Sequence, residues 1–146
     1  MPKSALLPAA FSCAFLVLLL SPSPAPASTA TFSAPIPICG SGPRVTCIVD
    51  GDTFWLDGNK IRIADIDTPE VSRPRCEQEK RLGKAATRAL QGLLSAGAFT
   101  LQRGARDRDR YNRLLRTIHR GPINLGARLV DQGLARPWTG SRQGWC

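Results

Sequence analysis

Hydrophobic and polar residues alternate between residues 44 and 66 in the pattern of β-strands. The runs that carry this pattern cover residues 44–50, 53–56 and 60–66. Gly51 separates the first two runs, and Asp57-Gly58 between the second and third is a strong hairpin signal. Because side chains alternate between the two faces of a strand, Arg62 lies opposite its isoleucine neighbours, and we expect it to point into the mouth of a barrel.

The apolar spacing lengthens to three or four residues between Glu77 and Ser95, which predicts an amphipathic helix that ends near Gly97. Its apolar stripe consists of Leu82, Ala86, Leu90 and Leu93. Two more strands are expected over residues 99–106 and 114–120, and a short helix over residues 123–132. Five strands, one longer helix and one short helix predict a mainly β, α+β fold, a five-stranded OB-type Greek-key barrel.

The N-terminal segment has the organisation of a signal peptide. Lys3 precedes an apolar run over residues 5–20, and residues 25–27 offer the small side chains of a cleavage site. An uncleaved membrane anchor is disfavoured, because the run is shorter than the roughly 18 to 20 residues that span a bilayer. The expected organisation is a signal peptide at 1–27, a flexible leader rich in Ser, Thr, Ala and Pro at 28–38, and one domain at 39–146.

The chain is strongly basic, with 20 Lys and Arg against 11 Asp and Glu and a formal net charge of +9. Removing residues 1–27 subtracts only Lys3, so 19 basic and 11 acidic residues leave +8. The excess is mostly arginine and clusters around Tyr111, next to Arg110, while the alternating signs of residues 107–110 predict a solvated hairpin. This charge favours nucleic acid over an anionic membrane surface, since the cluster lacks an amphipathic apolar face.

Five charged residues near the predicted strand ends supply the groups that phosphodiester hydrolysis needs. Asp52 and Asp67 offer hard oxygen ligands for Ca²⁺ or Mg²⁺. Arg62 and Arg113 can each form two hydrogen bonds to a phosphate and stabilise the charge that grows in the transition state. Glu70 is then a candidate to orient or deprotonate the attacking water. A turn-capping role for the two aspartates is disfavoured, because they would repel each other without a cation.

The order of these residues resembles that of the staphylococcal nuclease (thermonuclease) family. The resemblance extends over about residues 44–138 and rests on Asp50-Gly-Asp52, the run Ile61–Glu70 and Tyr111-Asn-Arg113. It implies a calcium ion held by Asp52, Asp67 and the main-chain carbonyl of Thr68, with Asp50 just outside these ligands. It also implies cleavage of the 5′ P–O bond, which leaves 3′-phosphate ends.

The same resemblance implies Arg62, Glu70 and Arg113 as the catalytic residues and places Tyr111 in the nucleotide site. The chain departs from the family after residue 135, where the tyrosines and the last helix of the staphylococcal enzyme are missing. Trp138 is therefore our candidate to stack on a substrate base, with a packing role as the alternative.

Four cysteines remain after residue 27, an even number that predicts two disulfides in a chain exported to an oxidising compartment. A zinc site is disfavoured because no Cys-x-x-Cys pair is present. Of the three possible pairings, the turn-rich stretch between Cys39 and Cys47 favours a local bridge there. The resembled fold brings the loop that contains Cys76 near the C-terminal segment, which favours a second bridge to Cys146.

The sequence thus predicts a secreted or periplasmic, Ca²⁺-dependent nuclease that cleaves DNA and RNA with little sequence specificity. We expect a monomer without stable membrane association once the signal peptide is removed. The alternative is a non-catalytic OB-fold module that binds single-stranded nucleic acid, which would need arginines and aromatic residues but no metal-binding aspartates. An extracellular adhesion domain would account for the disulfides but not for the charged motif.

Overall fold

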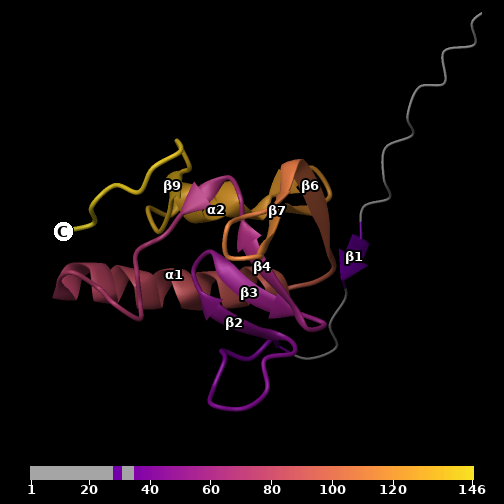
Figure 1. The fold of residues 1–146 in the computed structure, drawn as a ribbon, viewed down its shortest axis with the longest axis horizontal. Helices are drawn as coiled ribbons and strands as arrows, with labels where there is room; N and C mark the ends of the chain where they lie inside the picture. The colour runs from indigo at the N-terminus through magenta and orange to yellow at the C-terminus, as the bar shows by residue number, and fades with distance from the viewer. Residues whose placement is uncertain (1–27, 31–34) are drawn as a thin grey trace, which may run out of the picture.

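The computed structural model describes residues 28–30 and 35–146, so the predicted signal peptide lies outside the described residues. The strands are β1 (Ser28–Ala30), β2 (Cys47–Asp50), β3 (Thr53–Leu56), β4 (Asn59–Ile63), β5 (Ile66–Asp67), β6 (Phe99–Arg108), β7 (Leu114–Arg120), β8 (Ile123–Asn124) and β9 (Arg136–Pro137). The helices are α1 (Glu77–Ser95) and α2 (Leu125–Asp131) (Figure 1). In the described ranges, no helix is both long and apolar enough to cross a membrane.

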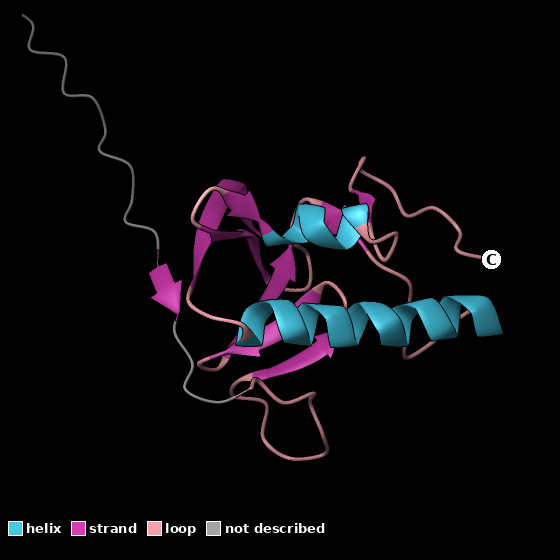
Figure 2. Ribbon diagram, turned by 180° about the vertical axis from the view of Figure 1, so that it is seen from behind, coloured by secondary structure: helices cyan, strands magenta, loops and turns pink. Residues whose placement is uncertain are grey.

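The five predicted strands, β2, β3, β4, β6 and β7, lie side by side in one strongly curled sheet. Its strand order is β1-β6-β7-β4-β3-β2, with β8 paired to β7, and a separate pair is formed by β5 and β9. Neighbouring strands are antiparallel except β4 and β7, which run parallel. The two helices pack against this sheet, α1 on β2 and α2 on β7 (Figure 2). The mixed α+β fold of OB type predicted from the sequence is therefore confirmed.

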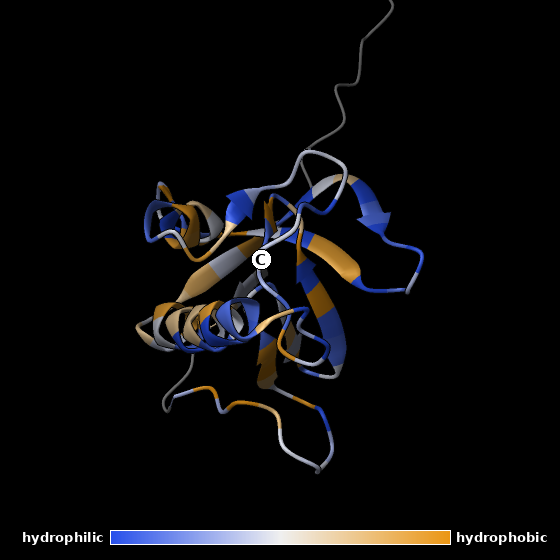
Figure 3. Cartoon of the chain, turned by 90° about the vertical axis from the view of Figure 1, so that its left-hand side faces the viewer, coloured by the Kyte–Doolittle hydropathy of each residue, from blue (hydrophilic) through white to orange (hydrophobic). Residues whose placement is uncertain are grey.

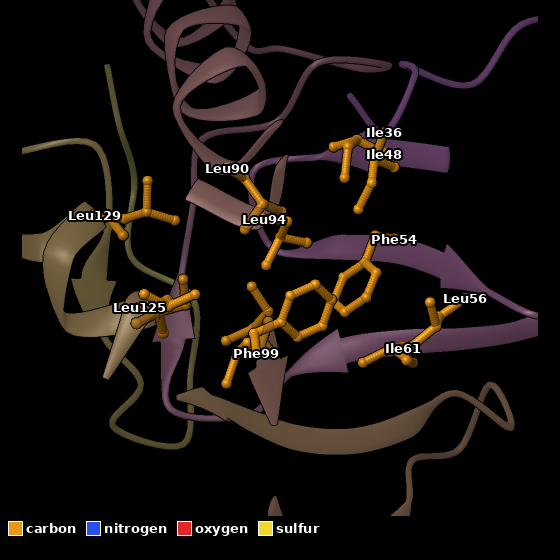
Figure 4. Close-up of a cluster of buried hydrophobic side chains, with 14 residues drawn as sticks. Ile36, Ile48, Phe54, Leu56, Ile61, Leu90, Leu94, Phe99, Leu125 and Leu129 are labelled. Carbon is orange, nitrogen blue, oxygen red and sulfur yellow. The ribbon is translucent and has the colours of Figure 1, made fainter. Parts of the chain in front are cut away.

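The hydrophobic core lies between α1, α2 and the concave side of the sheet. Figure 3 shows the alternation of hydrophobic and hydrophilic residues along individual strands, and Figure 4 shows the buried side chains that meet in the core. The rings of Phe54 and Phe99 pack edge to face with centroids 6.4 Å apart. Near the end of α1 the fully buried residue is Leu94, whereas the predicted Leu93 is only half buried. Leu94 follows Leu90 by four residues, so it continues the core-facing stripe.

The segment 28–38, predicted to be a flexible leader, makes defined contacts with the domain where the structure describes it, at residues 28–30 and 35–38. Strand β1 pairs antiparallel with β6, and Ile36 is only 1% exposed. The Ile36 N–H donates to Ser95 Oγ over 2.9 Å, while Gln91 donates to the Ile36 carbonyl over 2.9 Å. The segment is rich in Ser, Thr, Ala and Pro, so its composition did not indicate that Ile36 is buried in the hydrophobic core.

The predicted strand over residues 60–66 is divided in the structure by a turn at Ala64 and Asp65. The break has a physical reason, because the guanidinium of Arg62 donates to the carbonyls of both Ile63 and Ile66, the latter over 2.8 Å. The chain therefore curls around this side chain, and β5 pairs with β9 instead of extending β4.

Both ends of α1 are stabilised by residues outside the helix. Cys76 is the N-cap, and its sulfur accepts the Glu79 N–H over 3.5 Å. The last turn of α1 contains no basic residue. Instead, Arg120 on β7 donates to the carbonyls of Leu93, Gly97 and Ala98 over 2.6 to 3.2 Å. A positive charge beside the last carbonyls of a helix is stabilising.

The described cysteines form two disulfides, Cys39–Cys47 and Cys76–Cys146, which is the pairing favoured from the sequence. The first closes the loop before β2. The second joins the C-terminus to the start of α1, and Figure 1 shows these two segments on the same side of the molecule. On the chain-entropy model, a closed loop of about 70 residues contributes roughly 4 kcal/mol to stability.

Candidate active site

The register of three antiparallel strands brings the predicted site residues together at one end of the sheet. Asp50 on β2 pairs with Thr53 on β3, and Thr53 pairs with Arg62 on β4. The turn between β2 and β3 packs closely on α1, since a Cβ at Gly51 would lie 2.6 Å from the Cβ of Ala86. Glycine is therefore required for this turn to approach the helix.

Asp52, Arg62 and Asp67 form a buried network of ion pairs. Their exposed fractions are 2%, 6% and 5%. Arg62 Nη2 lies 3.3 Å from Asp52 Oδ2 and 3.7 Å from Asp67 Oδ1. Asp52 also accepts hydrogen bonds from the Thr53 hydroxyl over 2.8 Å and from the Thr68 N–H over 3.3 Å. Two carboxylates and one arginine of the sequence motif are thus adjacent in space and shielded from water.

Burial disfavours the charged forms of the carboxylates in this region. Burial, followed by the negative charge of Asp52, raises the pKa of Asp50 to about 7. Asp50 Oδ1 accepts the Asp52 N–H over 3.2 Å, which places Asp50 directly behind the network. Burial also raises the pKa of Asp67, although the positive charge of Arg142 acts in the opposite direction. A divalent cation would offset this concentration of buried negative charge.

Arg113 is directed toward the same network by the turn between β6 and β7. Its Nε donates to Asp109 Oδ2 over 2.7 Å, and its Nη1 donates to Thr53 Oγ1 over 3.4 Å. Because Thr53 donates in turn to Asp52, a chain of hydrogen bonds connects Arg113 with the acidic residues. Arg62 on β4 and Arg113, in the turn directly before β7, therefore approach the site from two neighbouring parts of the sheet.

The prediction of a solvated hairpin at residues 107–110 is wrong for Asp109. Its side chain is 9% exposed, and its Oδ1 accepts the N–H groups of Tyr111 and Arg113 over 2.9 and 3.0 Å. Burial acts to raise the pKa of Asp109, but the hydrogen bonds from Arg113 outweigh it, and the pKa lies below its ordinary value. Asp109 is thus the ionised group that holds this turn and Arg113 in place.

Glu70 lies on the loop that follows β5, and this loop is held against the start of α1. Glu79 is 4% exposed and accepts the N–H groups of Arg75 over 2.6 Å and of Glu70 over 3.4 Å. A Cβ at Gly83 would lie within 3.0 Å of the loop carbonyls, so the loop packs directly on the helix. The carboxylate of Glu70 forms an ion pair with Arg142.

A groove of about 930 Å³ opens beside this network. Six of the predicted site residues line it, namely Arg62, Glu70, Arg110, Tyr111, Arg113 and Trp138. Tyr111 is 64% exposed, and the guanidinium groups of Arg110 and Arg113 lie 4.8 and 5.5 Å from its ring centre. Trp138 lies with its ring 5.8 Å from the guanidinium of Arg62. Both aromatic candidates therefore border a cationic groove.

The donor set fits a hard cation such as Ca²⁺. In the part of the chain that the structure describes, no three His, Cys, Asp or Glu side chains gather to hold a metal. However, Asp67 Oδ1 is buried without a well-formed hydrogen bond, and it lies 3.7 Å from Arg62 Nη2 and 3.4 Å from Arg142 Nε. A buried carboxylate oxygen whose hydrogen-bonding capacity is not filled is costly and is a suitable ligand for calcium. Asp52, Asp67 and the Thr68 carbonyl would need water molecules to complete the coordination.

Four residues that shape the site are absent from the sequence-based prediction: Thr53, Glu79, Asp109 and Arg142. The sequence did contain a local signal for Asp109, because Asp and Asn residues favour turns and Asp109 is followed by Asn112. In the structure Asn112 has a φ of 62°, which is typical of a turn. Arg142 had no such signal, since its partner Glu70 lies 72 residues earlier in the chain. Only the folded tail brings it to the groove.

The fold and the site define an OB-like α+β domain in which arginines line an open groove beside a network of buried carboxylates. Residues 60–143, more than half of the chain, match the family of staphylococcal nuclease homologues, and the protein belongs to this family.

Relatives of the chain are found in several bacteria. The thermonuclease of Staphylococcus intermedius is 29% identical over 101 residues, which cover 66% of this chain and 60% of the relative. The thermonuclease of Staphylococcus hyicus is 29% identical over 97 residues, covering 64% and 57%. An uncharacterized endonuclease of Haemophilus influenzae is 33% identical over 97 residues, covering 63% and 49%. The chain therefore spans about half to three fifths of the length of these relatives.

Proposed function

We propose that this protein is a Ca²⁺-dependent nuclease that hydrolyses phosphodiester bonds of DNA and RNA and leaves 3′-phosphate ends. The observation that carries the proposal is the meeting of Asp52, Arg62 and Asp67 in one buried network that reaches the groove lined by Glu70 and Arg113. The names of the three relatives, two thermonucleases and one endonuclease, support the same activity.

Asp52, Asp67 and the Thr68 carbonyl are the groups that would hold the calcium ion, with Asp50 supporting them through the Asp52 N–H. When bound, the ion supplies a positive charge that polarises the phosphate and lowers the cost of additional negative charge. Calcium is favoured over magnesium because it tolerates irregular oxygen coordination with several waters.

The remaining chemistry belongs to the side chains in the groove. Arg62 and Arg113 bind the non-bridging oxygens of the scissile phosphate and stabilise the charge that develops on them. Glu70 accepts a proton from the water that attacks phosphorus in line with the leaving group. The bond between phosphorus and the 5′ oxygen breaks, the 5′ oxygen takes a proton from solvent, and the phosphate remains on the 3′ side.

Weak base specificity is expected, because contacts to phosphate carry no information on sequence. Tyr111 and Trp138 can stack on bases of any kind, and Arg110 adds a further phosphate contact.

We propose that the protein acts as a monomer in an oxidising compartment, either secreted or periplasmic, after removal of residues 1–27. Two disulfides in a small domain support that location.

The second candidate, a non-catalytic OB-fold module for single strands, is favoured only by the exposed aromatic residue and arginines of the groove. Digestion of plasmid DNA and of single-stranded RNA in Ca²⁺, in Mg²⁺ and in chelator separates the two functions. We expect cleavage of both substrates in Ca²⁺ and none in chelator. Binding without cleavage under all conditions would support the second candidate, and undiminished cleavage in chelator would contradict a metal requirement.

Glu70→Gln is expected to lower kcat by about 10²- to 10⁴-fold, because glutamine keeps the shape of the side chain but cannot accept a proton. The measurement is kcat as a function of pH for both forms. Glu77→Gln is the matched control, since Glu77 is 74% exposed on α1, and its activity should be unchanged. A near-normal pH profile for Glu70→Gln would show that Glu70 only orders its loop.

A further inference from the structure

We propose that Arg142 is a substrate-binding residue of this site. In the free protein its guanidinium pairs with Glu70 and Asp67, and on entry of the nucleic acid it transfers to a backbone phosphate. This inference rests on the proposed nuclease function. It concerns the C-terminal tail, residues 138–146, which contributes four of the residues that line the groove: Trp138, Gly140, Ser141 and Arg142.

The tail has a defined place because it is attached at both ends. At its start, the Trp138 N–H donates to the Asp65 carbonyl over 2.9 Å, next to the pairing of β9 with β5. At its end, Trp145 is only 8% exposed, and the guanidinium of Arg136 lies 3.9 Å from its ring centre. The disulfide Cys76–Cys146 then joins the last residue to the cap of α1. Arg142 is therefore presented to the groove from between two fixed points.

The contacts of Arg142 are of a kind that a phosphate can replace. Its side chain is 45% exposed, its Nη1 pairs with Glu70, which is itself 36% exposed, and its Nε lies 3.4 Å from Asp67 Oδ1. The pair with Glu70 joins two partly exposed groups and contributes little to stability, because water competes for both partners. Asp67 is 6% exposed, but it keeps Arg62 as an ion-pair partner when Arg142 moves away. By contrast, the side chain of Arg62 is 7% exposed and is also bound to main-chain carbonyls. Arg142 is thus free to exchange partners, whereas Arg62 is fixed.

The exchange also has a chemical consequence for Glu70. One oxygen of its carboxylate is occupied by Arg142 in the free protein. A phosphate that enters the groove offers Arg142 a partner with which guanidinium forms two parallel hydrogen bonds. The same event releases the Glu70 carboxylate for the attacking water. Arg142 should therefore contribute chiefly to substrate affinity, in contrast to a residue that acts only on the chemical step.

The test measures binding and cleavage separately. Binding of a fluorescein-labelled single-stranded thymidine oligonucleotide is followed by anisotropy in chelator, and KM and kcat are measured in Ca²⁺. We expect Arg142→Ala to weaken binding at low salt by about five- to tenfold and to raise KM similarly, with kcat within about twofold. The slope of log affinity against log salt should fall by about 0.7, the value for one lost phosphate contact on a single strand. Arg142→Lys should restore part of the affinity.

Arg128→Ala is the matched control, because Arg128 is 53% exposed on α2, pairs with Asp131 and does not line the groove. It removes the same charge and should leave affinity, salt slope and KM unchanged. A Cys76→Ser/Cys146→Ser variant should lose affinity like Arg142→Ala, and adding Arg142→Ala to it should cost little more. If that variant does not fold, the single Arg142→Ala comparison decides alone.

Three results would overturn the inference while the nuclease function stands. Arg142→Ala could equal Arg128→Ala in affinity, salt slope and KM. It could lose kcat alone, in which case Arg142 acts only through Glu70. It could bind more tightly, in which case Arg142 opposes the substrate. A wild-type protein that neither binds nor cleaves would instead overturn the proposed function, and this inference with it.

Discussion

Replacing Asp52 with asparagine is expected to abolish Ca²⁺-dependent cleavage while the protein remains folded. Asparagine keeps the size of the side chain and one acceptor oxygen, so it can still accept the hydrogen bond from either Thr53 or Thr68, which reach different oxygens of Asp52. It removes the negative charge that would bind the cation. Asp52→Ala should also be inactive. It leaves the buried guanidinium of Arg62 with one carboxylate fewer, so we expect it to lose about 3 to 5 kcal/mol of stability.

Two measurements check this prediction independently. Isothermal titration calorimetry reports Ca²⁺ affinity without any substrate, and thermal unfolding reports whether each variant is folded. Asp131→Asn is the matched control, because Asp131 is 67% exposed on α2, and its charge should not affect calcium binding. Unchanged Ca²⁺ affinity or full activity in Asp52→Asn would contradict the proposed metal site.

Replacing Arg113 with alanine is expected to lower kcat by about 10³- to 10⁵-fold with a much smaller change in KM. An arginine that meets charge developed only in the transition state affects turnover more than ground-state binding. The geometry supports this role, since Arg113 is held by Asp109 and Thr53 at the edge of the acidic network. Arg113→Lys should recover little, because lysine keeps the charge but cannot form two parallel hydrogen bonds to a phosphate.

Steady-state kinetics on a defined oligonucleotide in Ca²⁺ gives kcat and KM for each Arg113 variant. Arg88→Ala, on the exposed face of α1, removes the same charge away from the groove and should behave like the wild type. If Arg113→Ala raised KM with kcat unchanged, Arg113 would bind ground state and transition state equally, and its assignment to catalysis would be wrong.

Much of the fold is encoded in local patterns. The helix over Glu77–Ser95 and the strand over Thr53–Leu56 have the bounds that apolar spacing predicts, because each element buries one face whose period is set by the backbone. The division of the strand at residues 60–66 escaped prediction, since it depends on hydrogen bonds from Arg62 to main-chain carbonyls that come together only after folding. The burial of Ile36 in the core could not be predicted for a similar reason, because its hydrogen-bond partners on α1 lie more than 50 residues away in the chain.

The candidate site divides in the same way. The sequence by itself determined the types and order of Asp52, Arg62 and Asp67, because hard oxygens and guanidinium groups near strand ends have a chemistry that does not depend on their exact positions. Only the tertiary structure decided that Arg113 reaches Thr53, 60 residues earlier in the chain, and that Arg142 lines the groove beside Glu70. These two contacts join distant parts of the chain, so their existence depends on strand register, on the curl of the sheet and on a disulfide, none of which a local pattern contains.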